Sequence, residues 1–187
     1  MTAPSSHAVI PAWLVPFLSL PLRRLWDQPE RLVLPLVQPG ARILEVGPGS
    51  GWFTWPMALA VGPAGRILCV ELQEPVRRRL ARAAVRRHLA QVEVRACGAH
   101  DLGLEDLAGT LDLAVAIDVL HETPDPAATL RQMAATLRPG GRLLIREPKG
   151  HCPRALFEAE QAWAVQAGLA PAPWDKPSPM AALFQKV

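Results

Sequence analysis

The chain has 187 residues, of which half are hydrophobic and a fifth are charged, and its formal net charge is +3. This length suits a single domain, and this composition excludes collagen-like, coiled-coil and mainly disordered chains. Three cysteines stand far apart in the sequence, so we expect neither a disulfide framework nor a zinc knuckle, but a reduced, cytoplasmic setting.

The first forty residues are apolar and repeatedly interrupted by proline. The stretch 8–22 contains three prolines and has no basic start, which argues against a signal peptide or a membrane-spanning helix and for a soluble protein. Two short helices are predicted, at 12–20 and 29–37. We expect residues 1–40 to form an extension or lid over the carboxyl ends of the strands. The side chains expected to wall an apolar pocket are Trp13, Phe17, Leu20, Leu25 and Trp26.

A rival interpretation of this extension is a membrane surface, because Arg23 and Arg24 follow the apolar residues. A second basic feature is the run of six arginines between Arg77 and Arg87. Such a run can attract nucleic acid, but it is more typical of a solvated helix face, so nucleic acid is not predicted as a partner.

From residue 41 onward, short apolar runs alternate with helical patterns. Asp125 is the expected N-cap of one helix, which the sequence LRPGG is expected to end at Pro139 and Gly140. The predicted strands are 41–46, 66–71, 92–96, 111–117, 142–145, 169–172 and 180–186, and the helices are 52–61, 75–89, 126–137 and 154–167. This alternation predicts an α/β fold, with residues 41–187 forming a doubly wound, mostly parallel seven-stranded sheet covered by helices on both faces.

The sharpest motif is LEVGPGSG, which spans Leu44–Gly51 between the first strand and the first helix. Glycines at 47, 49 and 51 allow a tight turn and a close approach of the backbone to a ligand. A dinucleotide-binding fingerprint would place its third glycine at position 52, where this chain has Trp52. The spacing therefore weakens the pyrophosphate interpretation.

Glu71 follows twenty residues after Gly51, at the carboxyl end of the second predicted strand. A carboxylate there can accept hydrogen bonds from both hydroxyls of a ribose. An ordinary strand-end acid is the alternative. Together with the glycine loop, Glu71 favours a nucleoside site at the switch point of the sheet.

The chain resembles a class I S-adenosylmethionine-dependent methyltransferase, and most closely the small methyltransferases related to ubiquinone and menaquinone biosynthesis. The segments that carry the resemblance stand in family order: LEVGPGSG, CVEL (Cys69 to Leu72), LDLAVAIDVLHE (Leu111 to Glu122) and LRPGGRLLIREP (Leu137 to Pro148). The resemblance implies a Rossmann-like fold, S-adenosylmethionine as cofactor, and a small-molecule methyl acceptor.

The resemblance also implies a role for each cofactor-binding position. The residues around the methionine part would be Glu45, Gly47, Pro48, Gly49, Ser50 and Gly51. Glu71 would hold the ribose, Leu72 would pack on the adenine, and Asp118 and Val119 would border the amino group and the sulfonium. Family members often have an Asp after the third strand that faces the adenine, where this chain has Gly98. Backbone atoms of Gly98 or Ala99, or the side chain of Asp101, are the expected substitutes.

Methyl transfer from a sulfonium requires a general base only if the nucleophile arrives protonated. His121 is the strongest candidate, because it follows the fourth strand and its ordinary pKa is near neutrality. A loop histidine bonded to backbone is the alternative. Glu122, Glu147 and His151 occupy similar strand-end positions and are weaker candidates. No metal ligands are predicted.

The acceptor and the methylated atom are left open by the sequence, as is the oligomeric state. Asp118 is not followed by the Pro-Pro-aromatic sequence of adenine and glutamine amino-methyltransferases, which argues against those acceptors. A metalloid acceptor would depend on Cys97 and Cys152. Two other functional classes remain as alternatives, a nicotinamide-dependent oxidoreductase and a non-catalytic S-adenosylmethionine-binding protein.

Overall fold

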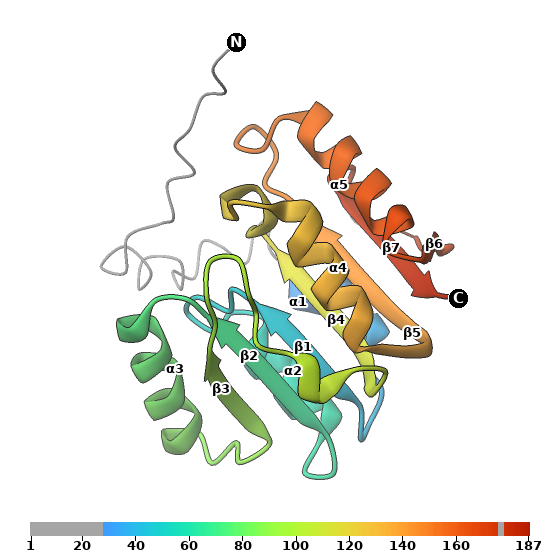
Figure 1. Cartoon of the computed structure of the whole chain (residues 1–187). Helices are drawn as coiled ribbons and strands as arrows, with labels where there is room; N and C mark the ends of the chain where they lie inside the picture. Colours follow the sequence, from blue (N-terminus) through green and yellow to red (C-terminus); the bar gives the residue numbers. More distant parts are fainter. Residues whose placement is uncertain (1–27, 176–177) are drawn as a thin grey trace.

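The computed structural model of the protein describes residues 28–175 and 178–187 (Figure 1). The predicted helix at 12–20 and all five predicted pocket-wall side chains lie outside the described residues. Within the described part of the chain, no helix combines the length and the apolar character needed to cross a membrane.

One seven-stranded sheet organises the described residues, in the spatial order β3-β2-β1-β4-β5-β7-β6. The strands are β1 (Arg42–Val46), β2 (Arg66–Glu71), β3 (Val92–Ala96), β4 (Leu111–Ile117), β5 (Leu137–Arg146), β6 (Leu169–Pro171) and β7 (Ala181–Lys186). The first five strands pair in parallel, whereas β7 pairs antiparallel with both β5 and β6. The strand order reverses between β1 and β4, so ligands are expected at the carboxyl ends of these two strands.

Helices cover both faces of this sheet, as predicted. The helices are α1 (Pro29–Leu32), η3 (Leu34–Leu36), α2 (Thr54–Val61), α3 (Glu74–Arg86), η4 (Glu105–Leu107), η5 (Leu120–Glu122), α4 (Pro126–Thr136) and α5 (Arg154–Gln166). One core cluster joins α1, η3, α2 and α3 to one face, and a second joins α4 and α5 to the other (Figure 1). Asp125 is the N-cap of α4, as expected, and its Oδ1 accepts the N–H of Ala128 at 2.8 Å.

The prediction of one continuous helix over residues 29–37 is wrong. Two short turns, α1 and η3, stand in its place because Pro35 cannot donate the backbone hydrogen bond that a continuous helix needs there. Val33 and Leu36 are buried in the core cluster that contains Met57 of α2. This part of the predicted extension therefore packs into the core beside α2, and the prediction of a lid remains for residues 1–27.

The predicted start of β5 is also wrong. The helix α4 ends at Thr136, and β5 begins at Leu137, which pairs with Leu111 of β4. The next paired residue of β5 is Arg142, so residues 138–141 form a bulge in the strand. A Cβ on Gly141 would lie 2.9 Å from the carbonyl oxygen of Leu111. The glycines of this segment thus permit a bulge inside a strand rather than ending a helix.

Candidate functional site

The glycine loop follows β1 at the switch point of the sheet. Gly47, Gly49 and Gly51 all have positive φ, at 66°, 54° and 83°. A Cβ on Gly47 would lie 2.5 Å from Val119 Cγ2, and a Cβ on Gly51 would lie 2.4 Å from the Trp55 ring. A Cβ on Gly49 would meet no atom within 4 Å. Gly47 and Gly51 therefore allow close packing of the loop, whereas Gly49 borders open space.

The structure brings Glu71 to this loop, as the sequence predicted. Glu71 is 8% exposed, and its Oε1 accepts the N–H of Gln73 at 2.8 Å. Burial raises the pKa of Glu71 above its ordinary value, although hydrogen bonds from backbone N–H groups, including that of Gly49, and the charge of Arg77 partly oppose the shift. The carboxylate thus lies against the loop beside the open space at Gly49.

Two further predicted cofactor residues lie beside this pair. The Oγ atom of Ser50 is buried and has no hydrogen-bond partner among the residues that the structure describes. Leu72 is 42% exposed, and its carbonyl oxygen accepts a hydrogen bond of 2.5 Å from Arg77. A buried hydroxyl without a partner is costly, so Ser50 fits a site that a polar ligand completes.

Glu45, which the resemblance implies to lie near the methionine part of the cofactor, is 4% exposed. Its Oε2 accepts a hydrogen bond from the hydroxyl of Thr54 at 2.6 Å and lies 3.6 Å from Sγ of Cys69. Burial raises the pKa of Glu45 to about 7, against the opposing hydrogen bonds from Thr54 and Cys69. Glu45 therefore connects β1 to β2 and to the start of α2.

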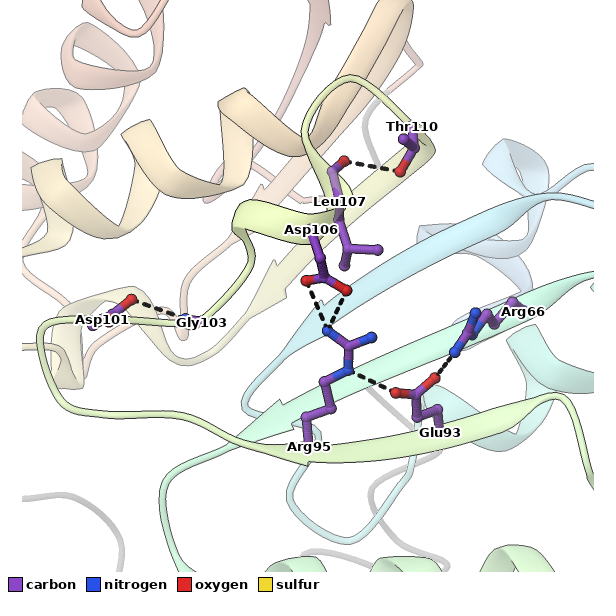
Figure 2. Close-up of polar contacts among 8 residues, drawn as sticks. All are labelled: Arg66, Glu93, Arg95, Asp101, Gly103, Asp106, Leu107 and Thr110. Carbon is purple, nitrogen blue, oxygen red and sulfur yellow. Dashed lines mark hydrogen bonds and ion pairs between the residues drawn. The ribbon is translucent and has the colours of Figure 1, made fainter.

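The loop after β3 is stabilised by hydrogen bonds among its own residues, 98–103. The N–H of Gly98 donates to the carbonyl oxygen of Asp101 at 2.6 Å, and Oδ1 of Asp101 accepts the N–H of Gly103 at 2.9 Å. Figure 2 shows this last contact, and it also shows Arg95 joining Glu93 of β3 to Asp106 of η4. The segment that carries Gly98 and Ala99 is therefore held in place next to the end of β3.

Asp118 follows β4 with the unusual backbone φ of +58°. A left-handed conformation at a non-glycine residue stores strain and is often found at functional sites. The carboxylate of Asp118 pairs with the guanidinium of Arg146 at 3.0 Å, and the guanidinium lies 5.8 Å from the centre of the Phe53 ring. Asp118 and Val119 thus connect the end of β4 to the end of β5 and to the glycine loop.

His121 forms a dyad with Glu147, whose side chain is fully buried at the end of β5. Nδ1 of His121 bonds to Glu147 Oε2, and Glu147 Oε1 accepts the N–H of Leu120 at 3.0 Å. Burial alone would lower the pKa of His121, but the hydrogen bond and charge of Glu147 outweigh it and raise the pKa above 6.5. Nε2 of His121 lies 3.9 Å from Glu122, and the His151 ring is 5.6 Å away. All four sequence candidates for the acid-base group are therefore neighbours.

A family model for a methyltransferase domain matches residues 20–182, which is most of the chain. The chain belongs to this methyltransferase family. The predicted methyltransferase family is therefore confirmed, and the match goes against the nicotinamide oxidoreductase alternative.

Curated relatives of this methyltransferase domain include O-methyltransferases. It is 36% identical over 126 residues to nocamycin O-methyltransferase of Saccharothrix syringae, a match that covers 67% of this chain and 42% of that protein. It is 33% identical over 106 residues to ubiquinone biosynthesis O-methyltransferase of Xanthomonas axonopodis pv. citri, covering 57% and 42%. The chain thus spans less than half the length of these two relatives.

A solved structure shows the same fold along nearly the whole methyltransferase domain. A SAM-dependent methyltransferase from Aquifex aeolicus superposes with a TM-score of 0.80 at 18% sequence identity, covering 95% of this chain and 98% of that one. At this low identity, the likeness concerns the fold alone. The predicted doubly wound, mostly parallel seven-stranded sheet is confirmed.

Sequence reasoning missed Phe53, Thr54 and Arg146 of this methyltransferase domain. Phe53 and Thr54 come after Trp52 at the end of the glycine loop, where the sequence shows only an apolar helix start. Arg146 ends a buried strand, so its charge at that position was a signal that could have placed it at the site.

Proposed function

We propose that this chain is an S-adenosylmethionine-dependent methyltransferase that methylates a hydroxyl group of a small molecule, with His121 as the general base. The observation that carries this proposal is the pairing of His121 with buried Glu147 at the ends of β4 and β5. The family match and the names of the two O-methyltransferase relatives support it.

The proposed cofactor-binding site, called the cofactor seat below, lies in the open space beside the glycine loop. Gly49 leaves room for close approach, the Ser50 hydroxyl offers an unused hydrogen-bonding group, and the Glu71 carboxylate suits two vicinal hydroxyls. When bound, S-adenosylmethionine supplies an electrophilic methyl group on its sulfonium. We assign Leu72, Gly98 and Ala99 to the adenine side of this seat, and Asp118 and Val119 to the side nearer His121.

As the proposed general base, His121 takes the proton from the hydroxyl group that is methylated. Glu147 holds the ring through Nδ1, which directs Nε2 to act as the base. Negative charge on Glu147 stabilises the imidazolium that forms when Nε2 takes the proton. The buried dyad therefore supplies both the orientation and the electrostatic support that removal of a hydroxyl proton requires.

The rival metalloid acceptor does not fit the positions of the cysteines. Cys97 follows β3 and Cys152 follows β5, and the three strands β2, β1 and β4 lie between β3 and β5 in the sheet. Burial raises the pKa of the Cys97 thiol to about 11 and that of Cys152 to about 12. Two protonated thiols on opposite sides of the switch point are poor joint ligands.

We further propose that residues 1–27 cover the acceptor.

The cofactor part of the proposal is tested by replacing Glu71 with Gln, which keeps the shape of the side chain and removes its charge. Loss of one charge-assisted bidentate contact, worth about 1.5 to 3 kcal/mol, should weaken S-adenosylhomocysteine binding at least about tenfold. Isothermal calorimetry measures this affinity. The matched control is Glu74→Gln, three residues after Glu71, which removes an exposed carboxylate paired with Arg78 and should leave the affinity unchanged. Equal affinities of wild type and Glu71→Gln would contradict the assignment.

A further inference from the structure

Glu160 of α5 carries a buried carboxyl group that has no role in the proposed mechanism. It is 0% exposed, and neither of its carboxyl oxygens has a hydrogen-bond partner in the part of the chain that the structure describes. Buried carboxyl groups are nearly always hydrogen-bonded, because burial without a partner is costly. This position therefore calls for a physical explanation.

Glu160 lies on the part of α5 that faces the His121–Glu147 dyad, because Phe157 and Ala164, about one turn before and after it, share a core cluster with Leu120, the residue before His121. Burial and the charge of Glu147 together raise the pKa of Glu160 to about 8, against the opposing charge of His121. The helix α4, which packs against α5, faces the same core with apolar side chains such as Leu130 and Met133. The loop after β5 adds His151 and Cys152, and Glu122 and Asp118 act on His121.

The hydrogen bonds of the two buried glutamates differ. Glu147 accepts the N–H of Leu120 and bonds to His121, both of which stabilise a carboxylate. Glu160 receives no donor from the described residues. Since two interacting buried carboxyl groups do not ionise together readily, Glu160, which has no donor, is the one that holds its proton near neutral pH.

We propose that Glu160 is a positioning residue that competes with His121 for one proton and so sets the pH range in which His121 works as a base. Removal of one proton from the cluster leaves two arrangements of equal charge. In one, His121 is neutral and Glu160 is protonated, and the base is available. In the other, His121 is protonated and Glu160 is ionised, and the base is blocked. This inference rests on the proposed function of His121.

The test replaces Glu160 with Gln, which cannot give up a proton. The blocked arrangement is then absent, so the measured pKa of His121 should fall by roughly 0.3 to 1 unit and its titration should become a single step. NMR of the histidine ring protons follows this titration without any methyl acceptor, and His121→Gln assigns the signal. Turnover of Glu160→Gln should correspondingly begin to rise at lower pH.

A matched control is Glu158→Gln, which removes an exposed acid on the same helix that pairs with Arg154. It should leave the His121 titration unchanged. If Glu160→Gln fails to fold, Glu160→Leu removes the same ionisable group and should give the same shift. A His121 titration identical to that of wild type in either folded variant would overturn the proposal, even if thermal stability changed. Full turnover in His121→Ala would instead contradict the base function while leaving the measured coupling intact.

Discussion

Replacing Gly49 by alanine should weaken S-adenosylhomocysteine binding by about 100-fold, or about 2.7 kcal/mol, while the chain stays folded. Gly49 has a φ of +54°, and a Cβ there would meet no protein atom within 4 Å. The added methyl therefore costs only the strain of a left-handed alanine, about 1 to 2 kcal/mol of stability. It would project into the space that we assign to the cofactor. Isothermal calorimetry measures the affinity, and circular dichroism confirms the fold.

Gly109→Ala is the matched control for Gly49→Ala. Gly109 has a φ of +66°, again with nothing within 4 Å of a Cβ, and it lies in the turn before β4, at the opposite ends of the strands. The two variants should lose similar stability, but only Gly49→Ala should lose affinity. Equal affinities would place the cofactor elsewhere. Gly47 and Gly51 are unsuitable, because a Cβ there would collide with Val119 or Trp55.

Replacing His121 by alanine should lower turnover by roughly 10²- to 10⁴-fold and leave cofactor affinity within about twofold. The ring contacts Glu147, and in our proposal it meets the acceptor rather than the cofactor. The measurement is release of S-adenosylhomocysteine with a panel of small phenols as acceptors. His88→Asn serves as control, because His88 is exposed after α3 and Asn tolerates its φ of 56°. Undiminished turnover in His121→Ala would return His121 to an ordinary loop histidine.

The pH dependence of wild-type turnover follows from the same dyad. The base form of His121 is the unprotonated ring, and Glu147 raises its pKa above 6.5. Turnover should therefore be low below this pKa and rise with pH through it. The same profile should be absent from the residual activity of His121→Ala.

The glycine loop and Glu71 could be predicted from the sequence because their geometry is local. A strand that ends in closely spaced glycines places the loop, and the next parallel strand places Glu71 at the same edge of the sheet. The bounds of β2, β3 and β4 were predicted correctly for a similar reason, since each is a short run rich in apolar residues. These features depend on sequence neighbours or on one strand pairing.

Glu160 and the bulge of β5 could not be predicted, because both depend on contacts between distant segments. The helical pattern of α5 marks Glu160 only as one acid on a helix, and its neighbours Glu147 and His121 come from other elements. In β5, the pairing of Leu137 with Leu111 decides that the strand begins before the glycines. The roles of such residues emerge only when the strands and helices are assembled.

Calorimetric titration of the wild-type chain with S-adenosylhomocysteine, beside a titration with NADH, tests whether the loop and Glu71 form the proposed cofactor seat. We expect saturable one-to-one binding of S-adenosylhomocysteine and no heat of binding from NADH, since Trp52 stands where the dinucleotide fingerprint needs a glycine. Saturable binding of NADH without binding of S-adenosylhomocysteine would contradict the proposed function of this chain.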